Sequence, residues 1–126
     1  MHKRVFKTKT FERWARKLIS DASLCHAARE IEGGLFEADL GQGLCKKRIA
    51  LPGQGKRGST RTLVAKRHPH AIIFLIGREK SGAGSDFSDT VVEAAKAIAI
   101  SLQRQSLDKL QELADIGQLK EICNDA

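Results

Sequence analysis

The sequence contains no apolar run that approaches the ~20 residues needed to cross a bilayer. Its longest candidate, residues 71–77, has the length of a β-strand. The N-terminus is basic, but no apolar core of a secretion signal follows it. We therefore expect a cytoplasmic protein with no membrane partner. At 126 residues the chain suits a single domain over residues 1–126 and is too short for two ordinary ones.

Cysteine is also scarce. The three cysteines, Cys25, Cys45 and Cys123, are far apart in the sequence and form no Cys-x-x-Cys pair. An odd number of cysteines without metal-ligand spacing favours free thiols in a reducing compartment over a disulfide or a metal site. His68 and His70 flank Pro69 without an evident third ligand, so we expect two solvated histidines in a turn and no metal.

Several catalytic signatures are absent as well. No Ser-His-Asp order, zinc-ligand spacing or pair of carboxylates stands out. The stretch Gly53-Gln54-Gly55-Lys56 lacks the spacing of a nucleotide-binding P-loop and precedes a strand where the P-loop precedes a helix. We expect no cofactor. The sequence alone leaves the proton acceptor of any reaction unassigned.

Positive charge is concentrated in the middle of the chain. The whole sequence has a formal net charge of +7, but residues 45–80 alone hold ten basic residues against one acidic residue, a net charge of +9. Such a segment repels itself unless a polyanion binds it, and the phosphates of RNA or DNA are the obvious candidates. The alternative is a solvated basic face with no ligand. We expect the basic side chains to gather on one concave surface.

Hydrophobic periodicity predicts two short helices near the N-terminus, after a short strand at residues 5–7. Apolar residues recur at helical spacing over residues 11–19, with Thr10 as the expected cap, and over residues 24–31. Ser20 or Asp21 caps the second helix, and Gly33-Gly34 ends it. The connection between the two helices is short, which predicts a helical hairpin.

Residues 44–77 have the pattern of an antiparallel meander. Three β-prone stretches are separated by a Gly-rich loop at 52–58 and a turn at 67–70, and residues 71–76 should be a central buried strand. Ser88 and Ser106 should cap two C-terminal helices, and residues 119–122 are a final short strand or tail. We predict an α+β fold, a small antiparallel sheet of three to five strands with helices packed on one face.

The basic loop and the strand after it are the most informative part of the sequence. Lys56 and Arg57 lie among glycines that let the backbone approach a ligand closely. Arg61 shares a strand face with Leu63, so it either pairs within the sheet or emerges in a cleft. Arg78 and Lys80 follow the buried strand, where side chains are rigidly held. Arginine suits a phosphate because it donates two parallel hydrogen bonds.

Six stretches of the chain carry a resemblance to a known family. They are Val5–Lys17, Ile19–Asp21, Gly33–Gly41, Lys46–Gly58, Arg61–Leu63 and Leu107–Ile122. These stretches resemble bacterial toxins of the RelE/HigB type, which belong to the RelE/ParE superfamily. The similarity is strongest around the basic loop and extends over nearly the whole chain.

The resemblance implies the toxin of a type II toxin–antitoxin system, an mRNA interferase that inhibits translation. Such toxins are similar to metal-independent endoribonucleases that enter the ribosome and cut mRNA, and a cognate antitoxin silences them. The expected partners are therefore an antitoxin, mRNA and the ribosome. By position, the predicted catalytic residues are Lys56, Arg57, Arg61, Arg78 and Lys80. We expect the other basic residues of the segment to bind RNA; they are Lys46, Lys47, Arg48, Lys66 and Arg67.

The sequence also departs from this family. It has no tyrosine, whereas many relatives have one at or near the site. Where relatives often have an aromatic strand end followed by Ala-Lys-Asn, this chain has residues 76–81, Ile-Gly-Arg-Glu-Lys-Ser. Two alternatives therefore stay open: a non-catalytic nucleic-acid-binding module, and a gyrase-targeting toxin of the same fold.

Overall fold

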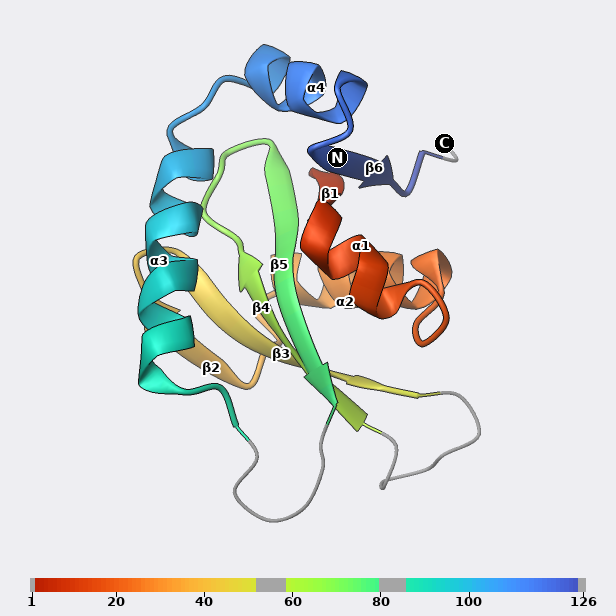
Figure 1. Ribbon diagram of the computed structural model, residues 1–126, viewed down its shortest axis with the longest axis vertical. Helices are drawn as coiled ribbons and strands as arrows, with labels where there is room; N and C mark the ends of the chain where they lie inside the picture. Colours follow the sequence, from red (N-terminus) through yellow and green to blue (C-terminus); the bar gives the residue numbers. More distant parts are fainter. Residues whose placement is uncertain (1, 52–58, 80–85, 125–126) are drawn as a thin grey trace.

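The computed structural model describes residues 2–51, 59–79 and 86–124 of the chain. In these residues one six-stranded sheet has the order β2-β3-β4-β5-β1-β6, and four helices accompany it (Figure 1). The strands are β1 (Arg4–Thr8), β2 (Ala38–Gly41), β3 (Leu44–Ala50), β4 (Ser59–Ala65), β5 (Ala71–Glu79) and β6 (Leu119–Ile122). The helices are α1 (Lys9–Ala15), α2 (Asp21–Glu32), α3 (Asp89–Gln103) and α4 (Leu107–Asp115).

The sheet is mostly antiparallel. The pairs β3–β4 and β4–β5 are antiparallel, as predicted for the central meander. β1 lies parallel to β5, with Val5 opposite Ile72. The α+β class and the mainly antiparallel sheet are as predicted, but the sheet has more than the predicted three to five strands and one parallel pair, for two reasons. The segment before β3 forms strand β2, and β1 joins β5 through a long connection that contains both N-terminal helices, as parallel pairing requires.

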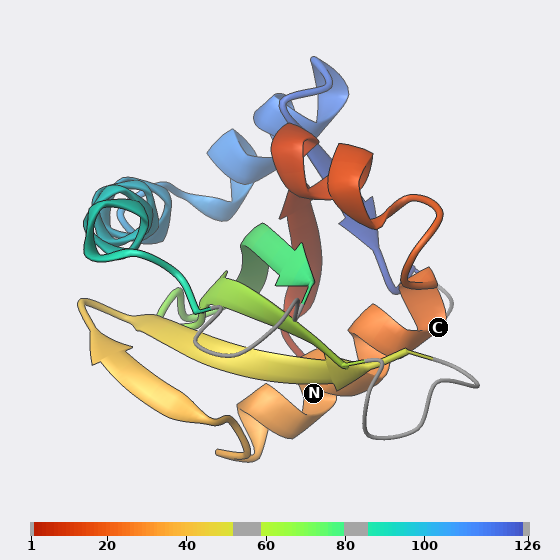
Figure 2. The same ribbon diagram turned by 60° about the horizontal axis from the view of Figure 1, so that its bottom comes forward.

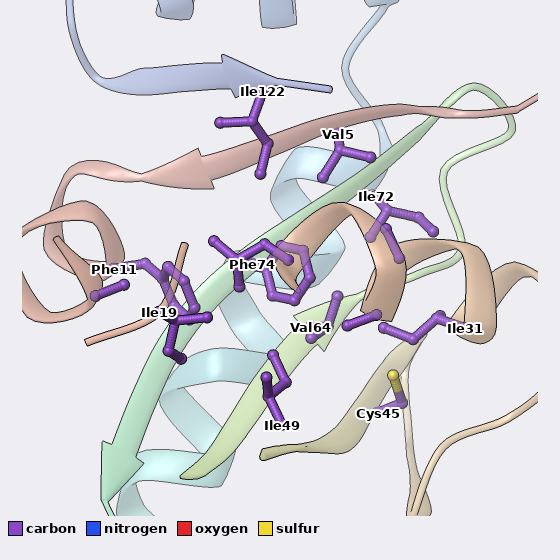
Figure 3. Close-up of a cluster of buried hydrophobic side chains, with 14 residues drawn as sticks. Val5, Phe11, Ile19, Ile31, Cys45, Ile49, Val64, Ile72, Phe74 and Ile122 are labelled. Carbon is purple, nitrogen blue, oxygen red and sulfur yellow. The ribbon is translucent and has the colours of Figure 1, made fainter. Parts of the chain in front are cut away.

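Helices cover both faces of the sheet, so the prediction that they pack on one face was wrong. One buried cluster joins α1 and α2 to the sheet, with Phe11 and Phe74 ring centroids 5.3 Å apart. Figure 3 shows the apolar side chains of this cluster converging around Phe74. A second cluster joins α3 and α4 to the other face, where Leu63 and Ile73 are fully buried. The strands β4 and β5 contribute apolar side chains to both clusters. These central strands are therefore buried on both faces.

Serine caps explain where three of the helices begin. Side chains of Ser20, Ser88 and Ser106 each accept a hydrogen bond from the backbone N–H three residues later, as predicted. The first helix differs from the prediction. Its cap is Thr8, not Thr10, and the helix ends at Ala15. The Thr8 hydroxyl also donates to the Leu75 carbonyl, at 2.8 Å, which fixes the end of β1 to β5.

The cysteines are not all free. Cys25 in α2 and Cys123 after β6 form a disulfide across a sequence separation of 98 residues. The prediction of three free thiols was wrong because cysteines that are distant in the sequence meet where the C-terminal segment passes α2. Cys45 is free and fully buried in β3. Burial raises the pKa of its thiol to about 12.

We expect Cys45 to resist alkylation in the folded protein, because the reactive thiolate is scarce at neutral pH and the sulfur is inaccessible. Iodoacetamide at pH 8 should leave the native chain unmodified, as read by intact mass. The same chain unfolded in guanidinium without reductant should gain one carbamidomethyl group, and the reduced unfolded chain should gain three. Rapid modification of the native protein would contradict the burial of Cys45.

His68 is a structural residue, although the sequence predicted a solvated side chain. It is 2% exposed, and both ring nitrogens have backbone partners. Nδ1 accepts from the His70 N–H, and Nε2 lies 2.8 Å from the Gln105 carbonyl oxygen. These bonds connect the β4–β5 turn to the α3–α4 connection. His68 therefore has no ring nitrogen left for a metal ion.

Gly77 allows a tryptophan to pack directly on β5. A Cβ atom at this position would lie 1.9 Å from Trp14 Cζ3 and 2.3 Å from Cε3. Gly77→Ala should therefore displace the indole and lower the free energy of unfolding by about 1–3 kcal/mol. Denaturant titration followed by the fluorescence of Trp14, the single tryptophan of the chain, measures both effects.

Gly33→Ala is the matched control for this substitution. A Cβ at Gly33 would make only ordinary contacts, 3.5 and 3.7 Å from backbone carbonyl oxygens, and its φ of −81° suits alanine. We expect little change in the native emission spectrum of this variant. An unchanged spectrum and unfolding midpoint in Gly77→Ala would contradict the close packing of Trp14 on β5.

Candidate functional site

Three arginines form a row across the central strands. Arg48 of β3 is directly opposite Arg61 of β4, and Arg61 is directly opposite Arg78 of β5. Side chains opposite one another in an antiparallel sheet share a face, with Cβ atoms about 4.5–5.5 Å apart. The register therefore places three guanidinium groups side by side on one face of the sheet.

The row lies on the face of the sheet that α3 and α4 cover. Residues two positions from Arg61 along a strand share its face, and Leu63 packs in the cluster of α3 and α4. In the next register row, Lys46 lies opposite Leu63 and so joins the same face. We call the four residues Lys46, Arg48, Arg61 and Arg78 the basic face.

A carboxylate lies against the basic face. Asp86 belongs to the segment that leads into α3. Figure 2 shows this segment running from the helix toward the sheet. Its Oδ2 is 2.7 Å from Lys46 Nζ, and its backbone carbonyl accepts a hydrogen bond from Arg78 at 3.0 Å. The hydrogen bond from Lys46 is the main cause that lowers the pKa of the Asp86 carboxyl, and the charge of Arg61 adds to it. Asp86 is therefore an anion at neutral pH.

Two of the predicted RNA-binding lysines lie on the opposite face. Lys47 is 4% exposed, and its ammonium lies 3.1 Å from both the Leu35 carbonyl and Glu30 Oε1. Lys66 is 3.4 Å from Asp39 Oδ2, and its ammonium sits over the Phe36 ring. The expectation of one shared surface was thus wrong for both lysines. Each is paired within the fold on the α2 side of the sheet.

Arg67, another residue predicted to bind RNA, is not part of the row. Arg67 is exposed beyond the other end of β4, about 20 Å along the strand direction from Arg61 at ~3.3 Å per residue. Its backbone N–H donates to Gln103 of α3. Lys56, Arg57 and Lys80 lie outside the described residues.

The basic face has the chemistry of a phosphate site. Like charges directly opposite one another destabilise a sheet, so the row favours an anion that can neutralise it. Arginines stay protonated at any pH the protein meets and donate in a fixed fork that matches phosphate oxygens. The described part of the chain holds no group of three or more histidine, cysteine or acidic residues suited to a metal ion. In the same residues, no helix has both the length and the apolar character that a bilayer crossing requires.

Sequence reasoning missed Asp86. One signal was present: Asp86 is the first acidic residue after Glu79, where the strongly basic segment gives way to an acidic C-terminal part. A carboxylate at that junction is drawn to the nearest cations. Lys46 and Asp86 are 40 residues apart in the sequence, so their contact is not visible in any local pattern.

Fold and site together define a small α+β protein that presents a row of cations on a sheet face, as a polyanion-binding protein requires. The model of the family described as the RelE toxin of the RelE/RelB toxin–antitoxin system matches residues 3–122. The chain belongs to the RelE toxin family. It is thus a toxin of a toxin–antitoxin system, and a cognate antitoxin is its expected protein partner. No curated protein matches the chain.

Proposed function

We propose that the chain is a metal-independent endoribonuclease that cuts mRNA on the ribosome and so inhibits translation. The observation that carries this proposal is the register Arg48–Arg61–Arg78, which aligns three permanent cations across adjacent strands. A single RNA strand carries one phosphate per nucleotide, and several cations on one face suit it. The dependence on the ribosome rests on membership of the RelE family.

The reaction would be an in-line attack of a ribose 2′-hydroxyl on the adjacent phosphorus. The bond from the 2′-oxygen to phosphorus forms, and the bond from phosphorus to the 5′-oxygen breaks, which leaves a 2′,3′-cyclic phosphate and a 5′-hydroxyl. Arg61 and Arg78 would stabilise the charge that develops on the phosphate oxygens. Lys46 and Arg48 would hold the neighbouring phosphates.

Two proton transfers complete this step. The 2′-hydroxyl proton passes to a base, and the leaving 5′-oxygen takes up a proton. Arginine cannot serve as the base because it does not lose its proton. We assign the transfers to lysines of the predicted catalytic set, Lys56 and Lys80: a neutral amine accepts the 2′-hydroxyl proton, and an ammonium group donates a proton to the leaving 5′-oxygen.

The test is a translation reaction with purified ribosomes, one reporter mRNA and the purified toxin. We expect new mRNA 5′ ends within the translated region, which primer extension maps, and these ends should vanish when ribosomes are left out. Uncut mRNA despite tight RNA binding would support a binding module. Intact mRNA with DNA breaks on induction in cells would support a gyrase-targeting toxin.

A further inference from the structure

The basic face already holds an anion from its own chain. Asp86 Oδ2 lies 2.7 Å from Lys46 Nζ, a normal length for a charge-assisted hydrogen bond. The adjoining carbonyl oxygen of Asp86 accepts from Arg78, so one residue occupies donors from both β3 and β5. These are donors that the oxygens of an RNA phosphate would need.

We propose that Asp86 stands in for an RNA phosphate on the basic face and must be displaced when RNA binds. This inference rests on the proposed function, since it assumes that the face binds RNA. Asp86 then sets the affinity: the ion pair with Lys46 must break before Lys46 can contact a phosphate. Asp86 acts as a competitor within the chain and has no part in the bond-breaking step.

The surroundings of Asp86 make this displacement easy. Its side chain is 48% exposed, so moving it uncovers no core. Among the residues that the structure describes, its Oδ1 accepts from the neighbouring Phe87 N–H alone, a local bond that turns with the residue. Exposed ion pairs stabilise a fold only weakly, so RNA phosphates with higher charge density can replace the carboxylate.

The physical consequence is a measurable change in salt dependence. Each phosphate neutralised on a single strand adds about 0.7 to the slope of log affinity against log salt concentration. In the wild type the displaced Asp86 carboxylate takes up a cation while the phosphate releases one, so the two effects largely cancel. Asp86→Asn keeps the size of the side chain and removes its charge, so Lys46 contacts the phosphate without breaking an ion pair and no cation is taken up. We expect a slope steeper by about 0.7 and an affinity higher by roughly threefold to tenfold at low salt.

The experiment uses the full chain and a fluorescent oligoribonucleotide with 2′-O-methyl riboses, which cannot be cleaved. Binding is followed by anisotropy at several KCl concentrations for the wild type, Asp86→Asn and a control. The control is Glu93→Gln, which removes the same charge from a 71% exposed carboxylate on α3. In a Lys46→Ala background, Asp86→Asn should have no further effect, because the cation it occupied is gone.

The outcomes separate this inference from the proposed function. Equal slopes and affinities for Asp86→Asn and Glu93→Gln, with RNA bound by both, would overturn the role of Asp86 alone. No RNA binding by the wild type or the variant would overturn the proposed function. Unchanged affinity of Asp86→Asn together with a loss of mRNA cleavage in the ribosome assay would overturn the competition and give Asp86 a part in the reaction itself.

Discussion

Arg61→Ala is expected to reduce mRNA cleavage by about 100-fold to 1,000-fold, the usual loss when one preorganised donor to a developing oxyanion is removed. Arg61 lies at the middle of the row, with Arg48 and Arg78 directly opposite on the two neighbouring strands. A phosphate on this face lies closest to the central guanidinium. The rate of appearance of new 5′ ends in the ribosome assay measures the effect, and growth on induction should return toward normal.

Two comparisons show whether the loss is specific. Arg13→Ala removes the same charge from an exposed position on α1, which packs on the other face of the sheet, and should cleave like the wild type. Arg61→Lys keeps the charge but loses the planar fork, so it should recover only part of the activity. The free energy of unfolding of Arg61→Ala should change by less than about 1 kcal/mol. Full cleavage by a folded Arg61→Ala protein would show that the basic face takes no part in the reaction.

Local signals in the sequence predicted the elements well. Serine caps and apolar spacing placed the starts of α2, α3 and α4 correctly, because capping depends on residues only three positions apart. The meander of β3, β4 and β5 followed from β-prone stretches separated by turns. These features depend on residues that are close together in the sequence, so the sequence alone is enough to predict them.

Contacts between distant segments could not be read in the same way. The Cys25–Cys123 disulfide depends on the pairing of β6 with β1. No sequence pattern near either cysteine predicts that pairing. The same holds for His68, whose partner is a carbonyl 37 residues away. The parallel pairing of β1 with β5 also joins segments that are far apart in the sequence, so no local pattern predicts it or the helices on both faces of the sheet.

One error about the site was avoidable. Lys46, Lys47 and Arg48 are consecutive residues of one strand, and consecutive side chains of a strand point to opposite faces. Cys45 and Ile49 are apolar and belong to the cluster under α1 and α2, so Lys47 between them had to share their face. The total charge of a segment predicts that it binds a polyanion. The alternation of side chains between the two faces of a strand is needed to predict which cations can bind the same polyanion.

The disulfide is expected to supply much of the stability of the folded protein. In the chain-entropy model, closing a loop of about 100 residues stabilises the native state by about 4–5 kcal/mol, because it restricts the unfolded chain. The separation between Cys25 and Cys123 is 98 residues. Domains of this size have a total stability of about 5–15 kcal/mol, so reduction should leave a marginally stable protein. Guanidinium denaturation followed by Trp14 fluorescence, with and without dithiothreitol, measures the difference.

The double variant Cys25→Ser/Cys123→Ser is the control for the reductant itself. It should unfold at the lower midpoint of the reduced wild type, and dithiothreitol should not change it further. An unchanged midpoint of the wild type on reduction would contradict the disulfide. Cys25 and Cys123 pack with the cluster under α1 and α2, whereas the basic face lies on the side of α3. Under conditions in which the reduced protein stays folded, the slope of log RNA affinity against log salt concentration should therefore be the same for the reduced and the oxidised protein. The cations on β3, β4 and β5 keep their register in both.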